Sequence, residues 1–376
     1  MIRVSVIVPA YNAQPFIEPA VASALRQTEQ RIEVIVIDDA STDATADIVS
    51  GMRAQDARVR LLQNPTNLGP GAARNRGLAA ARGSWIALLD ADDLFEPQRL
   101  ARLLAIGEAN GADIVSDNLL IWAEADASPP SLLIPPARLA APRRMPPEEF
   151  IIGDIGKRRR RRRRQLHTSY GFMQPMFRRR FLDVNDIRYH EASRFGEDYI
   201  LALRCLLCGA RWWITPEAMY RYRVRPGTLT EVQTAADLDR IRQAEGRMLR
   251  YSPLVAGNAS LVRALHRHKA AIDRRFYYRA FTDAMKAGSF AASWRLLFDE
   301  PGSWRHILLE SLRQAPVVAA KAARGGYSCN NLAWRARAAT GALCPAPEDM
   351  ASGRGGIAVA IHPGAIQPEG DHGDGP

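Results

Sequence analysis

Cysteine, lysine and long hydrophobic runs are scarce in this chain of 376 residues. Its four cysteines are too few for a disulfide framework. No stretch approaches the ~18 uninterrupted apolar residues of a membrane-spanning helix, so none is predicted. The first twelve residues carry no cleavage-site pattern, which predicts a chain without a signal peptide and a cytoplasmic location.

The positive charge is confined to the later part of the chain. The formal net charge is +11, yet residues 1–150 hold 14 basic and 19 acidic side chains, whereas residues 151–376 hold 37 and 21. One run from Lys157 to Arg164 provides eight of the positive charges. Such asymmetry usually separates two tasks. Apolar residues make up 47% of the chain, which excludes wholesale disorder.

Strand-like and helix-like segments alternate over residues 1–117. Short β-branched runs occupy residues 4–8, 33–38, 59–63, 85–89 and 113–116. Helical spacing of apolar residues lies between them, at residues 15–27, 43–52, 70–82 and 97–108, with Ser41 and Thr42 as candidate caps of the second helix. This alternation predicts an α/β fold, a Rossmann-like and mostly parallel sheet with helices on both faces.

The rest of the chain carries weaker signals. Residues 123–168 are rich in proline and include the arginine run, which predicts an irregular connection. Residues 235–325 have a mainly helical pattern, so we expect a helical extension. Residues 344–376 are rich in glycine and proline, which predicts a disordered tail.

Polar clusters follow three strands of the predicted sheet, at residues 9–12, 38–43 and 90–93. In open α/β sheets, ligands bind at the carboxyl ends of the strands, so these clusters are expected to converge. Asp90 and Asp92 offer the oxygen ligands that Mg²⁺ or Mn²⁺ prefers. The alternative is that these acids cap the helix near Pro97. No G-x-G-x-x-G follows the first strand, which counts against a dinucleotide site.

A glycine-containing turn at residues 67–77 opens the third helix. Helix N-termini attract anions, and Arg74 could reach a phosphate or a base from there. A solvated arginine in an ordinary turn is the alternative.

Together, the runs 6–12, 37–43, 67–77 and 89–93 resemble the family 2 inverting glycosyltransferases, which have the A-type nucleotide-sugar fold. The resemblance is tight over residues 2–118 and looser to about 231. The layout of residues 167–231 is similar to bacterial exopolysaccharide enzymes, particularly the succinoglycan-type β-glucosyltransferases. This implies a UDP-sugar donor, with UDP-glucose favoured and UDP-galactose or a UDP-N-acetylhexosamine open, and a lipid-linked oligosaccharide acceptor.

Two departures from other family members narrow the expected reaction. Processive members carry a Gln-x-x-Arg-Trp motif and membrane helices, but here Cys208 stands where that glutamine would precede Arg211 and Trp212. We therefore expect single additions. Transfer to lipid phosphate, as in dolichol-phosphate mannose synthases, is disfavoured by the extended region around Glu197 and Asp198.

The resemblance also implies roles for individual residues on the donor side. The nucleotide-sugar site would consist of Pro9, Tyr11, Asp38, Asp39, Arg74, Asp90, Ala91 and Asp92. Asp92 would bind Mn²⁺ or Mg²⁺ directly, and Asp90 would face the ribose or the metal's waters. The acids and the arginine agree with this on chemical grounds, because metal and arginine neutralise a leaving nucleoside diphosphate.

An inverting transfer also needs a base for the acceptor hydroxyl. The resemblance implies that Asp198 is that base and that Glu197 binds the acceptor or adjusts the pKa of Asp198. The alternative is that both carboxylates only stabilise the positive N-terminal end of a helix. Arg223 or Arg225 would belong to a loop that covers the phosphates, unless they lie on a basic surface strand. Cys205 and Cys208 are expected to pack rather than bind metal.

The arginine run has three interpretations: a solvated loop, a surface for anionic lipid or a lipid pyrophosphate, and a nucleic-acid contact. Its place between the donor and acceptor elements favours the lipid among the functional interpretations, and the absence of interleaved aromatic residues disfavours nucleic acid. We expect a peripheral enzyme at the inner face of the membrane. A non-catalytic basic adaptor is the competing class, disfavoured by Asp90, Asp92 and Asp198.

We expect the chain to divide into four segments. Residues 1–120 would be the nucleotide-sugar half, and residues 121–232 the acceptor and base half with its basic loop at 157–164. Residues 233–343 would be the helical extension and residues 344–376 the tail.

Overall fold

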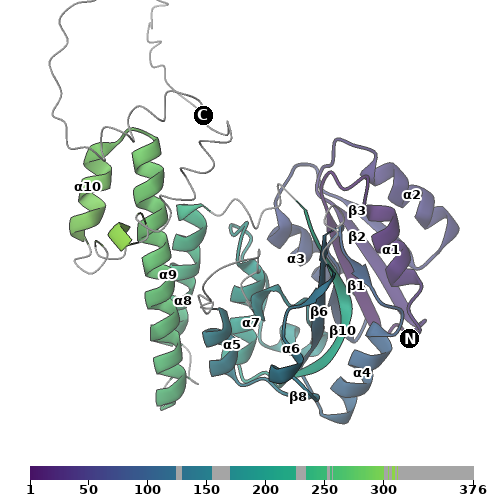
Figure 1. The fold of residues 1–376 in the computed structure, drawn as a ribbon. Coiled ribbons are helices and arrows are strands. Elements are labelled where there is room, and N and C mark those ends of the chain that lie inside the picture. Colours follow the sequence, from purple (N-terminus) through teal and green to yellow (C-terminus); the bar gives the residue numbers. More distant parts are fainter. Residues whose placement is uncertain are drawn as a thin grey trace, which may run out of the picture. The chain divides into compact units, whose positions relative to one another are not determined.

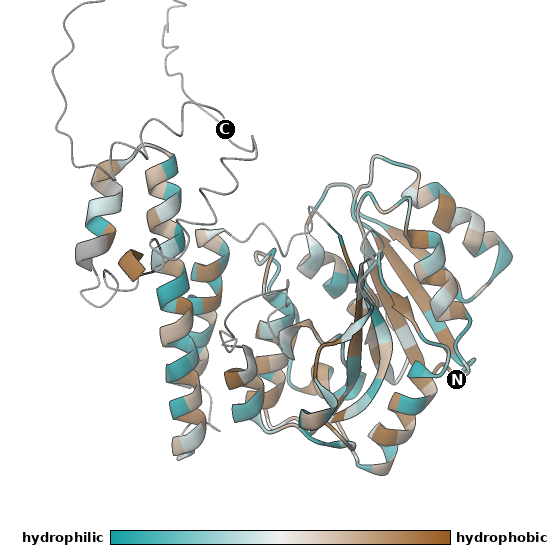
Figure 2. Cartoon of the chain, viewed as in Figure 1, coloured by the Kyte–Doolittle hydropathy of each residue, from teal (hydrophilic) through white to brown (hydrophobic). Residues whose placement is uncertain are grey.

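The computed structural model describes residues 1–123, 129–154, 170–225, 234–251, 255, 257–299, 304, 307–309 and 311 (Figure 1). Its first four long strands are parallel neighbours in the order β3-β2-β1-β4. Their bounds are β1 Val4–Ala10, β2 Ile32–Asp38, β3 Val59–Gln63 and β4 Trp85–Leu88. β1 and β2 are buried along almost their whole length, as expected for parallel strands covered on both faces. Figure 2 shows the same concentration of hydrophobic residues along the central strands.

Helices connect these strands and confirm the predicted β-α alternation. They are α1 Ile17–Leu25, α2 Thr45–Gln55, α3 Pro70–Ala80 and α4 Arg99–Ala109. α3 begins with a proline at its first position, where the missing N–H costs nothing. Gly77 lets α3 lie close on the sheet, because a Cβ there would stand 2.5 Å from Ile7 Cγ2.

The sheet continues past β4 with strands of both directions, in the order β4-β9-β6-β10-β5. The bounds are β5 Leu94–Phe95, β6 Ile114–Ala123, β9 Met176–Arg178 and β10 Trp212–Val224. β6 and β10 are parallel to each other, whereas β9 is antiparallel to β4 and β6. The long β10 matters for the site because its register places Tyr220 and Arg221 beside β5. β5 begins directly after the acidic turn at 90–93.

The predicted irregular connection at 123–168 is partly wrong. Within it the structure places β7 Ser131–Leu132, the 3-10 turn η1 Pro136–Arg138, β8 Arg143–Arg144 and α5 Pro147–Asp154. Phe150 and Ile151 of α5 are fully buried. A two-turn helix offers too few residues for a periodic signal, so the pattern could not reveal it. The arginine run lies outside the described residues, as do residues 344–376.

Further helices follow along the described part of the chain: α6 Arg179–Val184, α7 Glu197–Leu207, α8 Ala235–Tyr251 and α9 Ala259–Lys286. A 3-10 turn, η2 Tyr170–Phe172, precedes β9, and α10 Phe290–Asp299 follows α9. The expected helical extension is therefore present where it is described. No helix among the described residues is long and apolar enough to span a membrane.

Candidate active site

The turns after β1 and β2 are tied to each other by side chains. Asn12 N–H donates to Ser41 Oγ at 3.0 Å, and Thr42 N–H donates to Asn12 Oδ1 at 2.8 Å. Asn12 and Ala40 both have positive φ, so these turns are tight. The expectation that Ser41 and Thr42 cap α2 is wrong: the N-cap of α2 is Ala44, without a side-chain cap, because the two hydroxyl residues face Asn12 instead.

Asp39 uses its carboxylate to hold the loop before α3. It is buried and accepts hydrogen bonds from Asn64 Nδ2 at 2.6 Å and from the N–H groups of Leu68 at 3.0 Å and Gly69 at 2.8 Å. Gly69, the N-cap of α3, has a φ of +89°, which favours glycine. The loop is thereby fixed from the side of β2.

The other predicted nucleoside residues lie at the same sheet edge. Asp38 is buried, and its Oδ1 accepts from Ser41 N–H at 3.3 Å. The register pairs it with Ala10, the residue between Pro9 and Tyr11. Tyr11 is 51% exposed, so its ring is available to a ligand. Their predicted role in binding a nucleoside stays a prediction.

Arg74 is the centre of the site. Its guanidinium is buried and forms ion pairs with Glu197 Oε1 at 2.7 Å, Asp90 Oδ1 at 2.9 Å and Asp198 Oδ1 at 3.6 Å. It also lies 5.4 Å from the centre of the Tyr189 ring. One cation from α3 thus joins the acidic turn after β4 to the first turn of α7, more than 100 residues later. The alternative of a solvated arginine is wrong.

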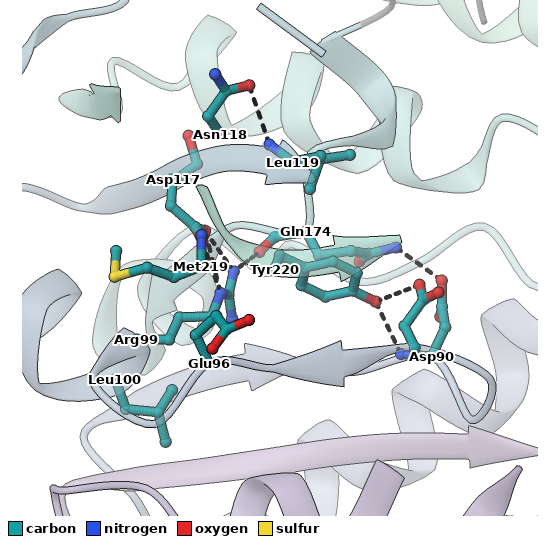
Figure 3. A network of polar contacts seen from close by, with 12 residues as sticks. Asp90, Glu96, Arg99, Leu100, Asp117, Asn118, Leu119, Gln174, Met219 and Tyr220 are labelled. Carbon is teal, nitrogen blue, oxygen red and sulfur yellow. Dashed lines mark hydrogen bonds and ion pairs between the residues drawn. The ribbon is translucent and has the colours of Figure 1, made fainter. Parts of the chain in front are cut away.

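Asp90 is held from three directions, and Figure 3 shows two of them, the contacts with Gln174 and Tyr220. Oδ1 accepts from Arg74, Oδ2 accepts from Gln174 Nε2 at 2.9 Å, and the backbone N–H donates to the Tyr220 hydroxyl at 3.2 Å. Sequence reasoning missed Gln174, which stands in no recognisable motif just before β9. Its backbone carbonyl accepts from Arg99, whose guanidinium forms a fully buried ion pair with Asp117 at 2.8 Å.

Asp92 and Asp93 face different surroundings. Asp92 Oδ2 accepts from Arg225 Nε at 2.7 Å, and its side chain is 21% exposed. Asp93 is buried and accepts from the Tyr220 hydroxyl and from Arg223 N–H, each at 2.7 Å. Burial and the neighbouring Asp90 and Asp92 raise the pKa of Asp93 well above its ordinary value. Through its hydrogen bonds with Tyr220 and Arg223, Asp93 fixes β10 to the acidic turn. None of these acids caps α4, whose N-cap is Gln98 without a side-chain cap.

Arg223 and Arg225 converge on this turn from the end of β10. Arg223 is 8% exposed and donates through Nε to the Asp92 carbonyl at 2.9 Å, so the alternative of a basic surface strand is wrong for it. Both guanidinium groups lie over the Phe16 ring, at 5.0 and 4.9 Å from its centre. The covering of phosphates by these arginines stays a prediction.

Asp198 has the pKa of a base that works near neutrality. Burial raises its pKa, Arg74 lowers it, and Glu197 and Asp90 raise it further, with the result at about 7. Oδ1 is buried and has no hydrogen-bond partner among the described residues, although the whole side chain is 23% exposed. Tyr189 is a neighbour of Asp198. Burial, and to a smaller extent the charge of Asp198, raises the pKa of Tyr189 well above its ordinary value. Glu197 and Asp198 do lie in the first turn of α7, but the N-cap is Gly196.

The fit of these residues to a divalent metal can be judged from their partners. The described residues contain no group of three or more His, Cys, Asp or Glu side chains that could form a metal cage. Both oxygens of Asp90 are engaged by the protein, whereas Asp92 has one oxygen engaged. Mg²⁺ and its relatives are commonly held by one or two carboxylates plus substrate phosphates. The residues therefore fit a metal shared with a diphosphate, with Asp92 as the available ligand.

Cys205 and Cys208 lie at the end of α7 away from this site. Cys205 is buried, and burial raises the pKa of both thiols. A thiol with a raised pKa is a poor metal ligand and nucleophile. The expected buried packing is confirmed for Cys205 but is wrong for Cys208, which is exposed.

Comparisons with known proteins give a consistent result. Residues 5–184 match the model of "Glycosyl transferase family 2". The chain is 34% identical over 318 residues to the succinoglycan biosynthesis protein ExoO of Rhizobium meliloti (strain 1021), which covers 85% of this chain and 87% of that protein. It is 35% identical over 301 residues to ExoU of the same organism, covering 80% of this chain and 84% of that protein.

Solved structures share the fold at lower identity. S. aureus TarS 1-349 in complex with UDP has a TM-score of 0.56 and 20% identity, covering 84% of this chain and 92% of that one. The mannosyltransferase PcManGT from Pyrobaculum calidifontis, in complex with GDP-Man and Mn²⁺, has a TM-score of 0.52 and 21% identity, covering 85% and 86%. This likeness confirms the predicted A-type fold.

Proposed function

Because the chain belongs to glycosyl transferase family 2 and is a glycosyltransferase, we propose that it moves one sugar from a UDP-sugar to a hydroxyl of a lipid-linked saccharide, with inversion. The observation that carries this is the Arg74 centre, which joins the donor-side Asp90 to the base candidate Asp198. The similarity to two succinoglycan biosynthesis proteins supports exopolysaccharide synthesis and favours glucose. UDP-galactose and UDP-N-acetylhexosamines are the alternative donors.

On the donor side, the nucleoside binds at the sheet edge formed by Pro9, Tyr11 and Asp38, next to the loop that Asp39 holds. A Mn²⁺ or Mg²⁺ ion held by Asp92 would neutralise the negative charge that develops on the leaving diphosphate. Arg225 adds positive charge beside Asp92. Asp90 is kept in place by Arg74 and Gln174 and faces the same region.

On the acceptor side, the hydroxyl oxygen attacks the anomeric carbon from the face opposite the diphosphate. The bond between that carbon and the phosphate oxygen breaks, and UDP leaves with the bonding electrons. Asp198 takes the hydroxyl proton. A pKa of about 7 leaves a useful fraction of Asp198 ionised at neutral pH while keeping it basic. Glu197 holds Arg74 at 2.7 Å and raises the pKa of Asp198.

The test is UDP release from UDP-glucose, UDP-galactose and UDP-N-acetylglucosamine, with and without Mn²⁺. We expect one donor to be preferred, and Asp92→Ala and Asp198→Asn to lower turnover at least 100-fold. Asp47→Asn, an exposed change in α2, is the control and should act like the wild type. Turnover that is independent of metal and of both substitutions would refute the mechanism, and the absence of nucleotide-sugar binding would favour the adaptor.

The place of action is a separate part of the proposal. The run from Lys157 to Arg164 would attract anionic head groups or a lipid pyrophosphate at the inner membrane face. Replacing residues 158–164 by Gly and Ser should abolish sedimentation with vesicles that contain phosphatidylglycerol. Unchanged sedimentation would make the run a passive loop.

A further inference from the structure

α8, which lies beyond the residues that match the family model, packs against the start of α7. The family model ends at residue 184, whereas α8 and α9 lie between residues 235 and 286. Gly196, the N-cap of α7, has a φ of +75°, and a Cβ there would stand 2.7 Å from Ile241 Cδ1 of α8. Ile241 is itself buried. The backbone that leads into Glu197 and Asp198 is therefore covered directly by α8.

A buried polar cluster lies one helical turn further along the same face of α8. The Tyr199 hydroxyl donates to Glu245 Oε1 at 2.7 Å, and His268 Nδ1 of α9 lies 2.6 Å from the same oxygen. The rings of Tyr199 and His268 stack at 4.8 Å between centres. Tyr199 is 4% exposed, and Glu245 and His268 are fully buried. The Tyr199 hydroxyl also lies 3.2 Å from His268 Nδ1, so each of the three side chains contacts the other two, although Glu245 Oε2 has no hydrogen-bond partner among the described residues.

Tyr199 directly follows Asp198 in the chain, and both belong to the first turns of α7. We propose that the α8–α9 pair positions the catalytic base: Tyr199, Glu245 and His268 fix the first turn of α7, and with it the direction of the Asp198 carboxylate. The proposal rests on the proposed role of Asp198. It gives the C-terminal helices a part in the reaction, although none of the three residues needs to touch substrate.

A positioning role predicts a loss in turnover rather than in donor binding. A misplacement of about 1 Å in a catalytic group can cost on the order of 100-fold in rate. We expect Tyr199→Phe to lower kcat for UDP release about 10-fold or more, with KM for the UDP-sugar within twofold of the wild type. Glu245→Gln keeps an acceptor for the tyrosine hydroxyl but removes the charge beside His268, so its loss should be smaller.

Two controls separate positioning from general stability. Leu265→Ala, in the buried face of α9, should lower Tm at least as much as Tyr199→Phe but leave kcat near the wild-type value at temperatures well below unfolding. His266→Gln changes an exposed imidazole two residues from His268 and should change neither property. Equal losses of kcat in Leu265→Ala and Tyr199→Phe would overturn the proposal.

Amide hydrogen exchange provides a readout that does not depend on activity. We expect residues 197–201 to exchange faster in Tyr199→Phe and Glu245→Gln, with β1 and β2 unchanged. Wild-type exchange and wild-type kcat in both variants would overturn the positioning role and leave Asp198 as the base. Full activity of Asp198→Asn would instead refute the proposed base, whatever the tyrosine variant does.

Discussion

Replacing the proposed base should stabilise the protein while it inactivates the enzyme. Burial raises the pKa of Asp198 from an ordinary 3.8 to about 7. Between these values the folded protein binds a proton that the unfolded chain has released, so the stability of the wild type falls as pH rises through this window. Above about pH 7 the folded site holds an ionised carboxylate at its full cost.

The size of the effect follows from the same two values. The gap between 3.8 and about 7 corresponds to roughly 4 kcal/mol, to an order of magnitude. An asparagine avoids this cost but still places an amide in a partly buried site, so about half the gain should survive. At pH 8 we therefore expect Asp198→Asn to be more stable than the wild type by about 2 kcal/mol, or about 4 °C in Tm.

Scanning calorimetry at pH 5 and pH 8 measures this difference. The advantage of Asp198→Asn should be present at pH 8 and largely lost at pH 5, where the wild-type carboxyl is mostly protonated. Asp183→Asn, which removes an exposed carboxylate paired with Arg188, is the control and should show no such change with pH. An Asp198→Asn protein that is less stable than the wild type at pH 8 would refute the assignment of a costly buried carboxylate. In the active wild type, kcat should rise with pH through about 7.

Further substitutions test the contacts around this centre. Arg74→Lys cannot reach Asp90 and Glu197 together, so we expect a loss of about 100-fold in kcat and a lower Tm, measured by UDP release and calorimetry. Gln174→Leu removes the donor to Asp90 Oδ2 and should raise KM for the UDP-sugar about 10-fold; an unchanged KM would make Gln174 a packing residue. Gly77→Ala should destabilise by about 1–3 kcal/mol through its clash with Ile7, whereas Gly51→Ala, with open space in α2, should be neutral or stabilising in the same urea titration.

The first 117 residues could be predicted well because their signals are local. β1, β2 and β4 consist mostly of apolar residues, and a polar turn stands at the end of each, so these strands and their clusters could be located from the sequence. The capping prediction at Ser41 and Thr42 failed because a residue from another turn, Asn12, uses their hydrogen-bonding groups. The amino-acid sequence alone does not reveal such competition between residues that are distant in the chain.

The contacts that complete the site could not be predicted for a related reason. Gln174 precedes a three-residue strand, and its meeting with Asp90 depends on β9 pairing antiparallel to β4. In the sequence, Tyr199 fits the apolar pattern of α7 and carries no other signal. Only the packing of α8 and α9 shows that its hydroxyl reaches Glu245. Sequence motifs identify the groups that act on substrate, but not the side chains that hold them.

The pKa near 7 at Asp198 results from opposing effects, of which burial is the largest. Burial and the charges of Glu197 and Asp90 raise its pKa, whereas the charge of Arg74 and, to a smaller extent, Tyr189 lower it. Without the arginine, the carboxyl would stay protonated at neutral pH and could not accept a proton from the acceptor. With the arginine but without burial, it would be ionised yet too weak a base. The same guanidinium also holds Asp90 on the donor side. A substitution that loosens Arg74 should therefore disturb the donor and the base together, and its effects on the two should not be additive with those of Asp198→Asn.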